Sequence, residues 1–438
     1  MAELTPLYTA EEMRAAEAGR DVDTMMQRAG AAVAEVLMRR FPDARRIALH
    51  AGGGANGGDG RIAAEILQGQ GRELVDERPD VVIDALLGTG LKGEPRDETA
   101  RAIEQINAGG APVVAVDIPS GVNASTGEVA GTAIRAEVTV TMHGPKVGLA
   151  IAPGRFQAGE VVVADIGLDA GETEHRLVTP EILAEVPRRS PRDNKYTAGH
   201  VLVVGGSRGM TGAAALASRA ALRADAGYVT IAAPSESLSV LETLVLEAVK
   251  RPLEQALDVA AKAQALAIGP GLGREDEARS LVRKLLAEVP LPAVVDADAL
   301  FELEPGDWPA PRVLTPHEGE LGRLLDRDSK EIAAHRLASV REAVERFRCV
   351  VVLKGDDSLV AAPGHGVLVC ALGLPSLSTA GTGDVLTGIT AAFLAKGMEP
   401  QRAAAAACAA QQLAAHEASQ RSGLVASDVI EALPRALG

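Results

Sequence analysis

The sequence is built on one repeated unit, a short apolar run followed by a glycine-rich turn and then a helical stretch. This alternation is typical of an α/β protein with a mostly parallel sheet, because parallel strands need helical crossovers between them. In the first half, the apolar runs predict strands at 46–51, 80–84, 112–118, 137–142 and 160–165. Thr9 with Glu12 forms a capping box that begins a first helix, and Asp21 or Asp23 begins a second helix that runs to Arg40.

The same pattern starts afresh after a polar, proline-containing stretch at 187–199. Strands are predicted near 200–205, 228–233, 265–269, 292–296, 312–315 and 349–353. Alanine-rich helices at 383–396 and 401–418 close the chain, since alanine has the highest helix propensity. We place the domain boundary ahead of a short helix expected at 178–186, which gives domains 1–171 and 172–438. A chain of 438 residues has room for two or three domains.

Composition excludes several classes of function. The formal net charge is −15 and aromatic residues make up 2% of the chain, whereas nucleic-acid binding needs clustered basic residues and aromatic stacking platforms. No apolar run reaches the ~18–20 residues of a membrane span, and the acidic N-terminus is unlike a signal peptide. The three cysteines show neither metal-binding nor disulfide spacing. We therefore expect a cytoplasmic protein that binds neither nucleic acid nor membranes.

In the first half, polar residues follow several of the predicted strands. The strand at 46–51 leads into a glycine loop at 52–60, an arrangement that points backbone N–H groups at a phosphate. Such loops also occur as plain strand–helix turns, and this one is neither GxGxxG nor a P-loop. Parallel strand ends meet at one crevice, which gathers oxygen ligands suited to a hard cation. These ligands are Asn56, Asp84, Asp117 and Ser120.

Lys146 follows another strand and forms an expected acid/base pair with Asp117. Taken singly, each of these residues is equally well explained as a helix cap or a solvated charge. Because several of them follow strands of the same predicted sheet, we favour a shared binding site over these separate explanations.

In the second half, the most specific segment is Thr379–Gly388, with the sequence TAGTGDVLTG, at the start of a long helix. The helix N-terminus forms an anion hole, and Asp384 is placed to take a proton from a hydroxyl that is being phosphorylated. The alternative role of Asp384 is a first-turn charge that complements the helix dipole. Further loops at 205–207 and 269–273, His317, and the strand end at Lys354–Ser358 fall on the same sheet edge.

These motifs resemble known families. GTGDVLTG, GPGLG and TPHEGE are similar to the ribokinase-like superfamily, and GGSRGMTGAAALASRAALRADAGYVT resembles its NAD(P)HX dehydratases. ANGGDG, DALLGTGLKGE, DIPSGVNASTGE and HGPKVGLA are similar to the NAD(P)HX epimerase domain. Together they match the bifunctional NAD(P)H-hydrate repair enzymes over nearly the whole chain. The fold implied is α/β, with a Rossmann-like three-layer N-terminal domain and a ribokinase-like C-terminal domain.

The resemblance implies two reactions and their residues. The first domain would interconvert R- and S-NADHX or NADPHX at C6, with a potassium ion held by Asn56, Asp84 and Ser120. The catalytic residues would be Asp117 and Lys146. The second domain would dehydrate the S form with Mg²⁺ and ADP or ATP, using Asp384 as base and releasing AMP and phosphate when ADP is used. A homo-oligomer is also expected.

The resemblance also implies binding residues in both domains. For the first domain, the substrate residues are Ala55, Asn56, Gly57, Gly58, Asp59, Gly88, Thr89, Gly90, Leu91, Lys92, Gly93, Glu94 and Asp117. For the second domain they are Ala213, Gly271, Gly273, His317 and Asp384. The nucleotide residues are Lys354, Gly355, Asp356, Asp357, Ser358 and Gly383.

Three departures and two alternatives accompany this interpretation. Ala55 stands where the family usually has asparagine, the segment 61–83 is short enough to lack a strand–helix unit, and 371–376 lacks an Asn-x-x-Gly character. One alternative is a ribokinase-like small-molecule kinase with an accessory nucleotide-binding N-terminal domain. The other is a first half that binds a nucleotide or a partner through a degenerate site.

Overall fold

The computed structural model describes residues 2–169, 171–420 and 422–438. The chain divides into two compact units. One contains Pro6–Arg176 with Ala333–Arg336, and the other contains Met1–Thr5, Leu177–Ile332 and Leu337–Gly438. The division falls at Arg176, five residues beyond the expected boundary at 171.

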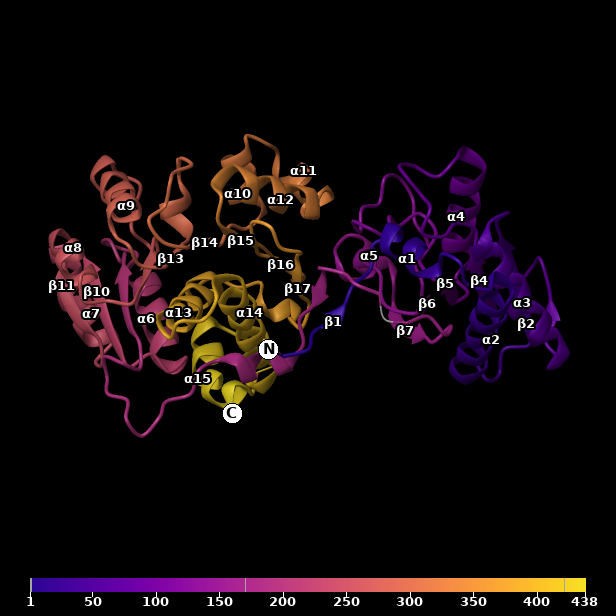
Figure 1. The fold of residues 1–438 in the computed structure, drawn as a ribbon, viewed down its shortest axis with the longest axis horizontal. Coiled ribbons are helices and arrows are strands. Elements are labelled where there is room, and N and C mark those ends of the chain that lie inside the picture. The colour runs from indigo at the N-terminus through magenta and orange to yellow at the C-terminus, as the bar shows by residue number, and fades with distance from the viewer. Residues whose placement is uncertain (1, 170, 421) are drawn as a thin grey trace. The chain divides into compact units, whose positions relative to one another are not determined.

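The N-terminal unit is a three-layer α/β structure around a parallel six-stranded sheet of order β3-β2-β4-β5-β6-β7. Its strands are β2 (Arg46–Ala51), β3 (Glu73–Leu74), β4 (Val81–Ala85), β5 (Val113–Val116), β6 (Val138–Met142) and β7 (Glu160–Ala164). Its helices are α1 (Ala10–Glu17), α2 (Val22–Arg40), α3 (Ala55–Gly69), α4 (Asp97–Gly109) and α5 (Val147–Ala150). Two hydrophobic cores flank the sheet: α2 and α3 pack on one face of it and α4 packs on the other (Figure 1).

Local sequence signals account for the ends of several of these elements. Thr9 and Glu12 form the expected capping box of α1, and Asp21 caps α2. The short segment between Gly60 and Asp84 contains β3, a two-residue strand at the sheet edge, and the chain then runs to β4 with no helix between them. The segment therefore contains a strand but no helix between β3 and β4.

The C-terminal unit is built on an eleven-stranded sheet of order β1-β8-β17-β16-β15-β14-β13-β12-β9-β10-β11. The pairings from β11 to β15 are parallel, whereas β16 pairs antiparallel with both of its neighbours. The strands that match the predictions are β9 (His200–Val204), β10 (Tyr228–Ala233), β12 (Ala265–Ile268), β13 (Ala293–Val295), β14 (Arg312–Leu314) and β15 (Val350–Leu353). The sequence did not predict β1 (Thr5–Pro6), β8 (Arg176–Leu177), β11 (Val249–Pro252), β16 (Ser358–Ala361) and β17 (Leu368–Cys370).

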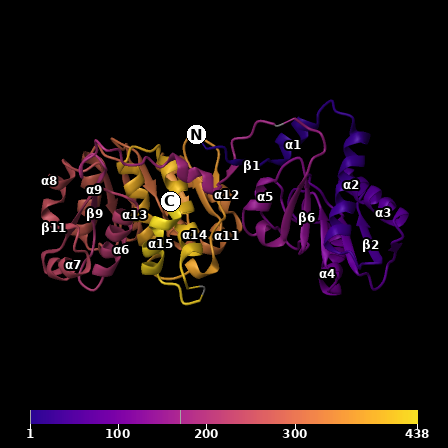
Figure 2. The ribbon, with the colours of Figure 1, turned by 90° about the horizontal axis from the view of Figure 1, so that it is seen from below.

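Four helices share one face of this sheet and lie side by side (Figures 1 and 2). They are α6 (Thr211–Arg223), α13 (Thr382–Ala395), α14 (Pro400–Glu417) and α15 (Ala426–Leu437). The remaining helices are α7 (Leu238–Leu244), α8 (Ala256–Ala260), α9 (Asp276–Glu288), α10 (Glu318–Leu325), α11 (Ser329–Ala334) and α12 (Arg336–Phe347). The helix expected at 178–186 is a 3₁₀ helix over Pro180–Glu185.

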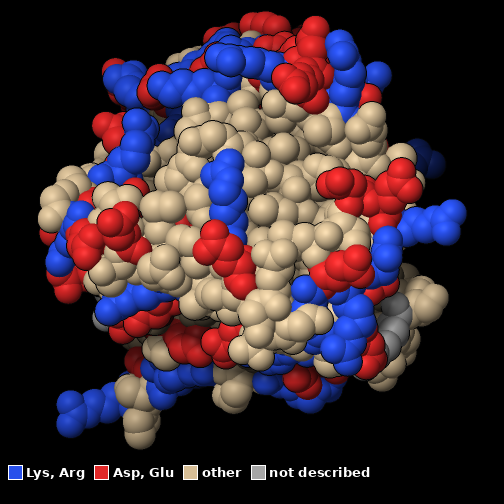
Figure 3. All heavy atoms as spheres, turned by 90° about the vertical axis from the view of Figure 1, so that its right-hand side faces the viewer, with Lys and Arg blue, Asp and Glu red and all other residues tan. Residues whose placement is uncertain are grey.

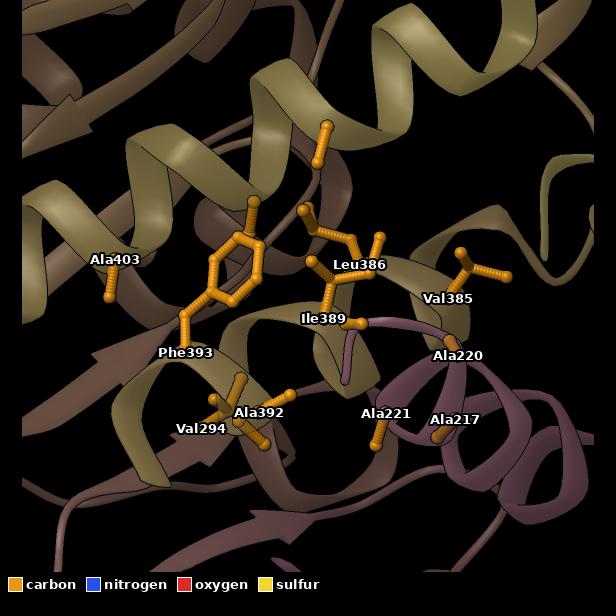
Figure 4. Packing of buried hydrophobic residues seen from close by; sticks show 14 of the residues in the cluster. Ala217, Ala220, Ala221, Val294, Val385, Leu386, Ile389, Ala392, Phe393 and Ala403 are labelled. Atoms are coloured by element: carbon orange, nitrogen blue, oxygen red, sulfur yellow. The ribbon is translucent and has the colours of Figure 1, made fainter. Parts of the chain in front are cut away.

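Small side chains let α6 and α13 pack closely. Alanines of α6, including Ala217, Ala220 and Ala221, lie against Val385 and Ile389 of α13 in a fully buried cluster (Figure 4). This packing fixes the N-terminal end of α13, which carries Asp384. Among the described residues, no helix is both long enough and apolar enough to cross a bilayer.

Candidate active sites

The N-terminal unit has a cavity of about 900 Å³ at the carboxyl ends of β2, β4 and β5. The glycine loop after β2 forms one wall because α3 begins directly at Ala55. Gly57 is required here, since a Cβ atom at this position would lie 2.0 Å from the carbonyl oxygen of Gly52. The expected substrate residues that line the cavity are Ala55, Asn56, Gly57, Asp59, Gly88, Thr89, Gly90, Leu91, Lys92, Glu94 and Asp117.

Two expected substrate residues, Gly58 and Gly93, are not among those that line the cavity. Gly58 faces α2 instead, where a Cβ atom would meet the Cε atom of Met26 at 2.1 Å. The cavity also has a lining residue that the sequence did not indicate, Glu17 at the end of α1. Charged side chains of both signs border a broad uncharged area on the face of this unit that Figure 3 shows.

Asp117 and Lys146 form the expected pair. The backbone of Asp117 is left-handed, with φ of 64°, directly after β5. Lys146 donates to Asp117 Oδ1 at 2.5 Å, and the amide of Met142 and the hydroxyl of Thr141 donate to the same oxygen. Asp117 lines the cavity with 15% of its side chain exposed, whereas the side chain of Lys146 is 0% exposed. The pair therefore consists of a carboxyl group at the cavity wall and a buried lysine behind it.

Asn56, Asp84 and Ser120 lie together beneath the cavity. Ser120 donates to both carboxylate oxygens of Asp84, through its hydroxyl at 2.6 Å and its amide at 2.8 Å. Asn56 Nδ2 donates to the carbonyl of Leu87 at 2.9 Å, and the Ser120 hydroxyl lies 3.3 Å from the same carbonyl. Burial raises the pKa of Asp84 to about 6, against the opposing effect of the Ser120 hydrogen bonds. Within the described part of the chain, Asn56 Oδ1 is buried without a hydrogen-bond partner.

In the C-terminal unit, Asp384 occupies the first turn of α13, whose N-cap is Gly381 with φ of 89°. Burial raises the pKa of Asp384 to about 7, with repulsion from Asp296 as the next contribution and attraction to Lys354 opposing it. Lys354 Nζ lies 2.9 Å from Asp296 Oδ1 and 3.7 Å from Glu320 Oε2. These carboxylates raise the pKa of Lys354 although its burial acts to lower it.

Asp296 is a functional residue that the sequence analysis missed. It follows β13 directly, is 1% exposed, and accepts a hydrogen bond from Thr387 of α13 at 2.8 Å. It thus connects the strand edge, Lys354 and α13. The signal was present in the sequence, because Asp296 ends a buried apolar run in the same way as Asp84 and Asp117 do.

A second cavity of about 420 Å³ adjoins this cluster. The expected nucleotide residues that line it are Lys354, Gly355, Asp356, Ser358 and Gly383, whereas Asp357 is buried and does not. Gln411 and Gln412 of α14 also line this cavity, and the sequence did not predict them. The loop at 371–376, which departs from the family's usual composition, contributes Gly373 and Leu374.

Only some of the expected hydrate-binding residues of this unit line the cavity. His317 lines the cavity, and its ring also caps α10 by accepting from the amides of Gly319 and Glu320. Gly271 and Ala213 lie next to each other away from the cavity lining. The amide of Gly273 donates to Asp298, whose charge acts on Asp384. Asp384 itself is not among the residues that line the cavity, whereas its neighbour Gly383 is.

The two units together define the class of protein. One is a Rossmann-like unit with a glycine loop and a carboxylate site, and the other is a ribokinase-like unit with a carboxylate at a helix N-terminus. Two family models match these units. The NAD(P)H-hydrate dehydratase model matches residues 201–435, and the model of the YjeF-related protein N-terminus matches 22–77 and 68–148. The two segments of the second match overlap at residues 68–77, which include β3.

Curated relatives extend the likeness to the whole chain. The bifunctional NAD(P)H-hydrate repair enzyme Nnr of Moorella thermoacetica is 36% identical over 94% of this chain and 92% of that protein. The enzyme of the same name from Coxiella burnetii is 34% identical over 97% of this chain and 98% of that protein. The solved ADP/ATP-dependent NAD(P)H-hydrate dehydratase of Bacillus subtilis, co-crystallized with ATP/Mg²⁺, is 28% identical with a TM-score of 0.55. It covers 59% of this chain and 96% of that one.

The chain belongs to the family of bifunctional NAD(P)H-hydrate repair enzymes. It is an enzyme of nicotinamide-cofactor repair, which confirms the interpretation drawn from the motifs and sets the small-molecule kinase aside.

Proposed function

We propose that the N-terminal unit interconverts R- and S-NAD(P)HX at C6 and that the C-terminal unit dehydrates the S form with ADP or ATP. The observation that carries this division is that each unit has its own cavity beside its own buried carboxylate–lysine cluster. The order of the two family matches along the chain supports the same assignment. A homo-oligomeric assembly stays a prediction.

In the N-terminal unit, Asp117 is the proposed proton acceptor for the epimerisation. Its contacts with Lys146, Thr141 and Met142 all fall on Oδ1, within the part of the chain that the structure describes. The other oxygen, Oδ2, is the one that we assign to the substrate. The loops at 55–59 and 88–94 hold the rest of the hydrated cofactor, with backbone N–H groups of the α3 N-terminus toward its phosphates.

A potassium ion fits the cluster beneath the cavity. Asn56 Oδ1 is a buried oxygen without a hydrogen-bond partner among the described residues, and Asp84 adds one buried carboxylate. Asn56, Asp84 and Ser120 are the proposed ligands. The ion would supply positive charge that orders the loops at 52–60 and 86–92.

In the C-terminal unit, Lys354, Gly355, Asp356, Ser358 and Gly383 are the proposed nucleotide residues, with Asp357 supporting their loop from its buried position. The N–H groups at the start of α13 receive the terminal phosphoryl group, because the first turn of a helix has no intrahelical acceptors. Asp384 takes the proton of the C6 hydroxyl as that oxygen attacks the phosphorus atom. Elimination then breaks the C6–O bond, so that phosphate leaves with its electron pair, and a C5 proton passes to solvent while the C5–H pair forms the C5=C6 double bond of the nicotinamide. Mg²⁺ would neutralise charge on the phosphates.

Paired substitutions test this division of labour. We expect Asp384→Asn to lower dehydration of pure S epimer by about 10²–10⁴-fold, because the amide cannot accept the hydroxyl proton, while nucleotide binding persists. We expect Asp117→Ala to stop conversion of R to S while dehydration of the S epimer stays at the wild-type rate. Chromatography of the epimers measures the first step and absorbance at 340 nm the second. Wild-type dehydration by Asp384→Asn, or unchanged epimerisation by Asp117→Ala, would remove the residue from its assigned role.

A further inference from the structure

The ammonium group of Lys146 has no N–H left to offer a substrate. It has three N–H bonds, and they are directed at Asp117 Oδ1 at 2.5 Å, Thr141 Oγ1 at 3.0 Å and the carbonyl of Met142 at 2.8 Å. Its side chain is 0% exposed and is not part of the cavity lining. Lys146 therefore holds Asp117 in its orientation at the cavity wall. The proton that epimerisation requires has to come from another group.

Asp59 is a second carboxyl group in the same cavity. It lies on α3, is 9% exposed and lines the cavity together with Asp117. Its Oδ1 atom is buried and has no hydrogen-bond partner in the described part of the chain. A buried carboxylate without a donor is costly, so this environment favours the neutral acid.

The charges around Asp59 act in the same direction as its burial. The charged side chains that line the cavity are Glu17, Lys92, Glu94, Arg96 and Asp117. Burial, and then repulsion from Asp117 and Glu17, raises the pKa of Asp59 to about 7. The cavity thus contains one carboxyl group that is paired with a lysine and another whose pKa lies near neutral pH. Two carboxyl groups in such different environments within one cavity are suited to act as base and acid.

We propose that Asp59 is the general acid of the epimerisation and that Asp117 is its base. This assignment rests on the proposed function of the N-terminal unit. The proton of Asp59 passes to the C6 hydroxyl, the C6–O bond breaks, and its electron pair leaves with the water formed. The lone pair of the ring nitrogen forms a C6=N double bond.

Addition of water completes the reaction. A water molecule attacks the opposite face of C6, its oxygen supplies the new C–O bond pair, and the C=N π pair returns to nitrogen. Asp117 accepts the proton that this water loses. The proton balance between Asp59 and Asp117 is restored through solvent in the open cavity. In the reverse direction the two carboxyl groups exchange roles.

The test uses Asp59→Asn in the full-length chain without nucleotide, so that dehydration does not occur. Pure R epimer is added, and the S epimer is measured by chromatography between pH 5 and 9. We expect kcat to fall by about 10²–10⁴-fold with KM nearly unchanged. We also expect loss of the wild-type decline in rate as the pH rises through about 7. Glu65→Gln, at an exposed position on the same helix, is the matched control and keeps wild-type rates.

Urea unfolding of the variant reports whether its N-terminal unit is folded. If Asp59→Asn does not fold, Asp59→Glu takes its place, and that variant keeps the decline with pH at a shifted midpoint. Wild-type kcat in Asp59→Asn, a raised KM with unchanged kcat, or loss of the decline in Asp59→Glu would each overturn the assignment. If the wild-type chain itself fails to convert R to S, the proposed function of this unit fails, and the role of Asp59 fails with it.

Discussion

Asp59 and Asp384 are carboxyl groups in places that solvate their charged forms poorly. Burial is the first cause of the raised pKa in both, and neighbouring carboxylates add to it. Their environments therefore favour proton transfer near neutral pH over stability of the fold. Such a trade between activity and stability is expected at active sites.

The raised pKa of Asp59 makes stability depend on pH. The folded chain binds this proton more tightly than the unfolded chain does, since the pKa rises from 3.8 to about 7. The contribution of Asp59 to stability is therefore complete below about pH 4 and is lost as the pH rises through about 7. We expect Asp59→Asn to raise the free energy of unfolding by about 1–3 kcal/mol at pH 8 and by a smaller amount at pH 5. Urea unfolding at both pH values measures this. A variant that is destabilised more at pH 8 than at pH 5 would contradict it.

At the residue scale, sequence reasoning found the groups that follow strands but not how they are partnered. Asp84, Asp117 and Asp384 were predictable because parallel strand ends and helix N-termini gather on one edge. The complete burial of Lys146 was not predictable from the sequence. It depends on hydrogen bonds to Thr141 and Met142, which give no sequence signal of their own.

At the scale of elements, the position of Asp384 depends on how closely α6 and α13 approach each other. Gly388 of α13 permits this approach, since a Cβ atom there would lie 2.0 Å from the carbonyl oxygen of Ala217. The contact is with backbone, so it is relieved only if the helices move apart. The same movement would displace the first turn of α13, where the proposed base is located.

Gly388→Ala tests this dependence. Alanine favours a helix by ~1 kcal/mol over glycine, but overpacking costs more, so we expect a net loss of about 1–3 kcal/mol in stability. Dehydration should slow while epimerisation does not change. Gly212→Ala on α6 is the matched control, since its Cβ atom would meet nothing within 4 Å and the variant should be as stable as wild type or more so. Thermal unfolding compares the two variants, and equal stability would refute the packing argument.

Element prediction succeeded for apolar runs in the interior of the sheet and failed for strands at or near its margins. The strands from β9 to β15 that lie in the interior of the sheet were predicted within a residue or two, because their runs are mostly apolar. The strands β3, β11, β16 and β17 lie at or near the sheet margins. Their pairing is decided by tertiary contacts, which periodicity does not reveal.

At the scale of the whole molecule, the chain combines two units whose sites have complementary tasks. Spontaneously formed hydrate is a mixture of two epimers, and a dehydratase that accepts only one of them needs an epimerase to use the rest. The short segment between β3 and β4 and the presence of Ala55 both fall in the N-terminal unit. They leave Asp59, Asp117 and the cavity in place, so we expect this unit to be active.

The most direct measurement follows absorbance at 340 nm after the full-length protein is mixed with racemic NADHX, Mg²⁺, K⁺ and ADP or ATP. We predict complete, nucleotide-dependent recovery of NADH, because both units act on the same substrate pool. Recovery that stops near half would show a dehydratase beside an inactive epimerase, and no recovery with either nucleotide would contradict the account as a whole.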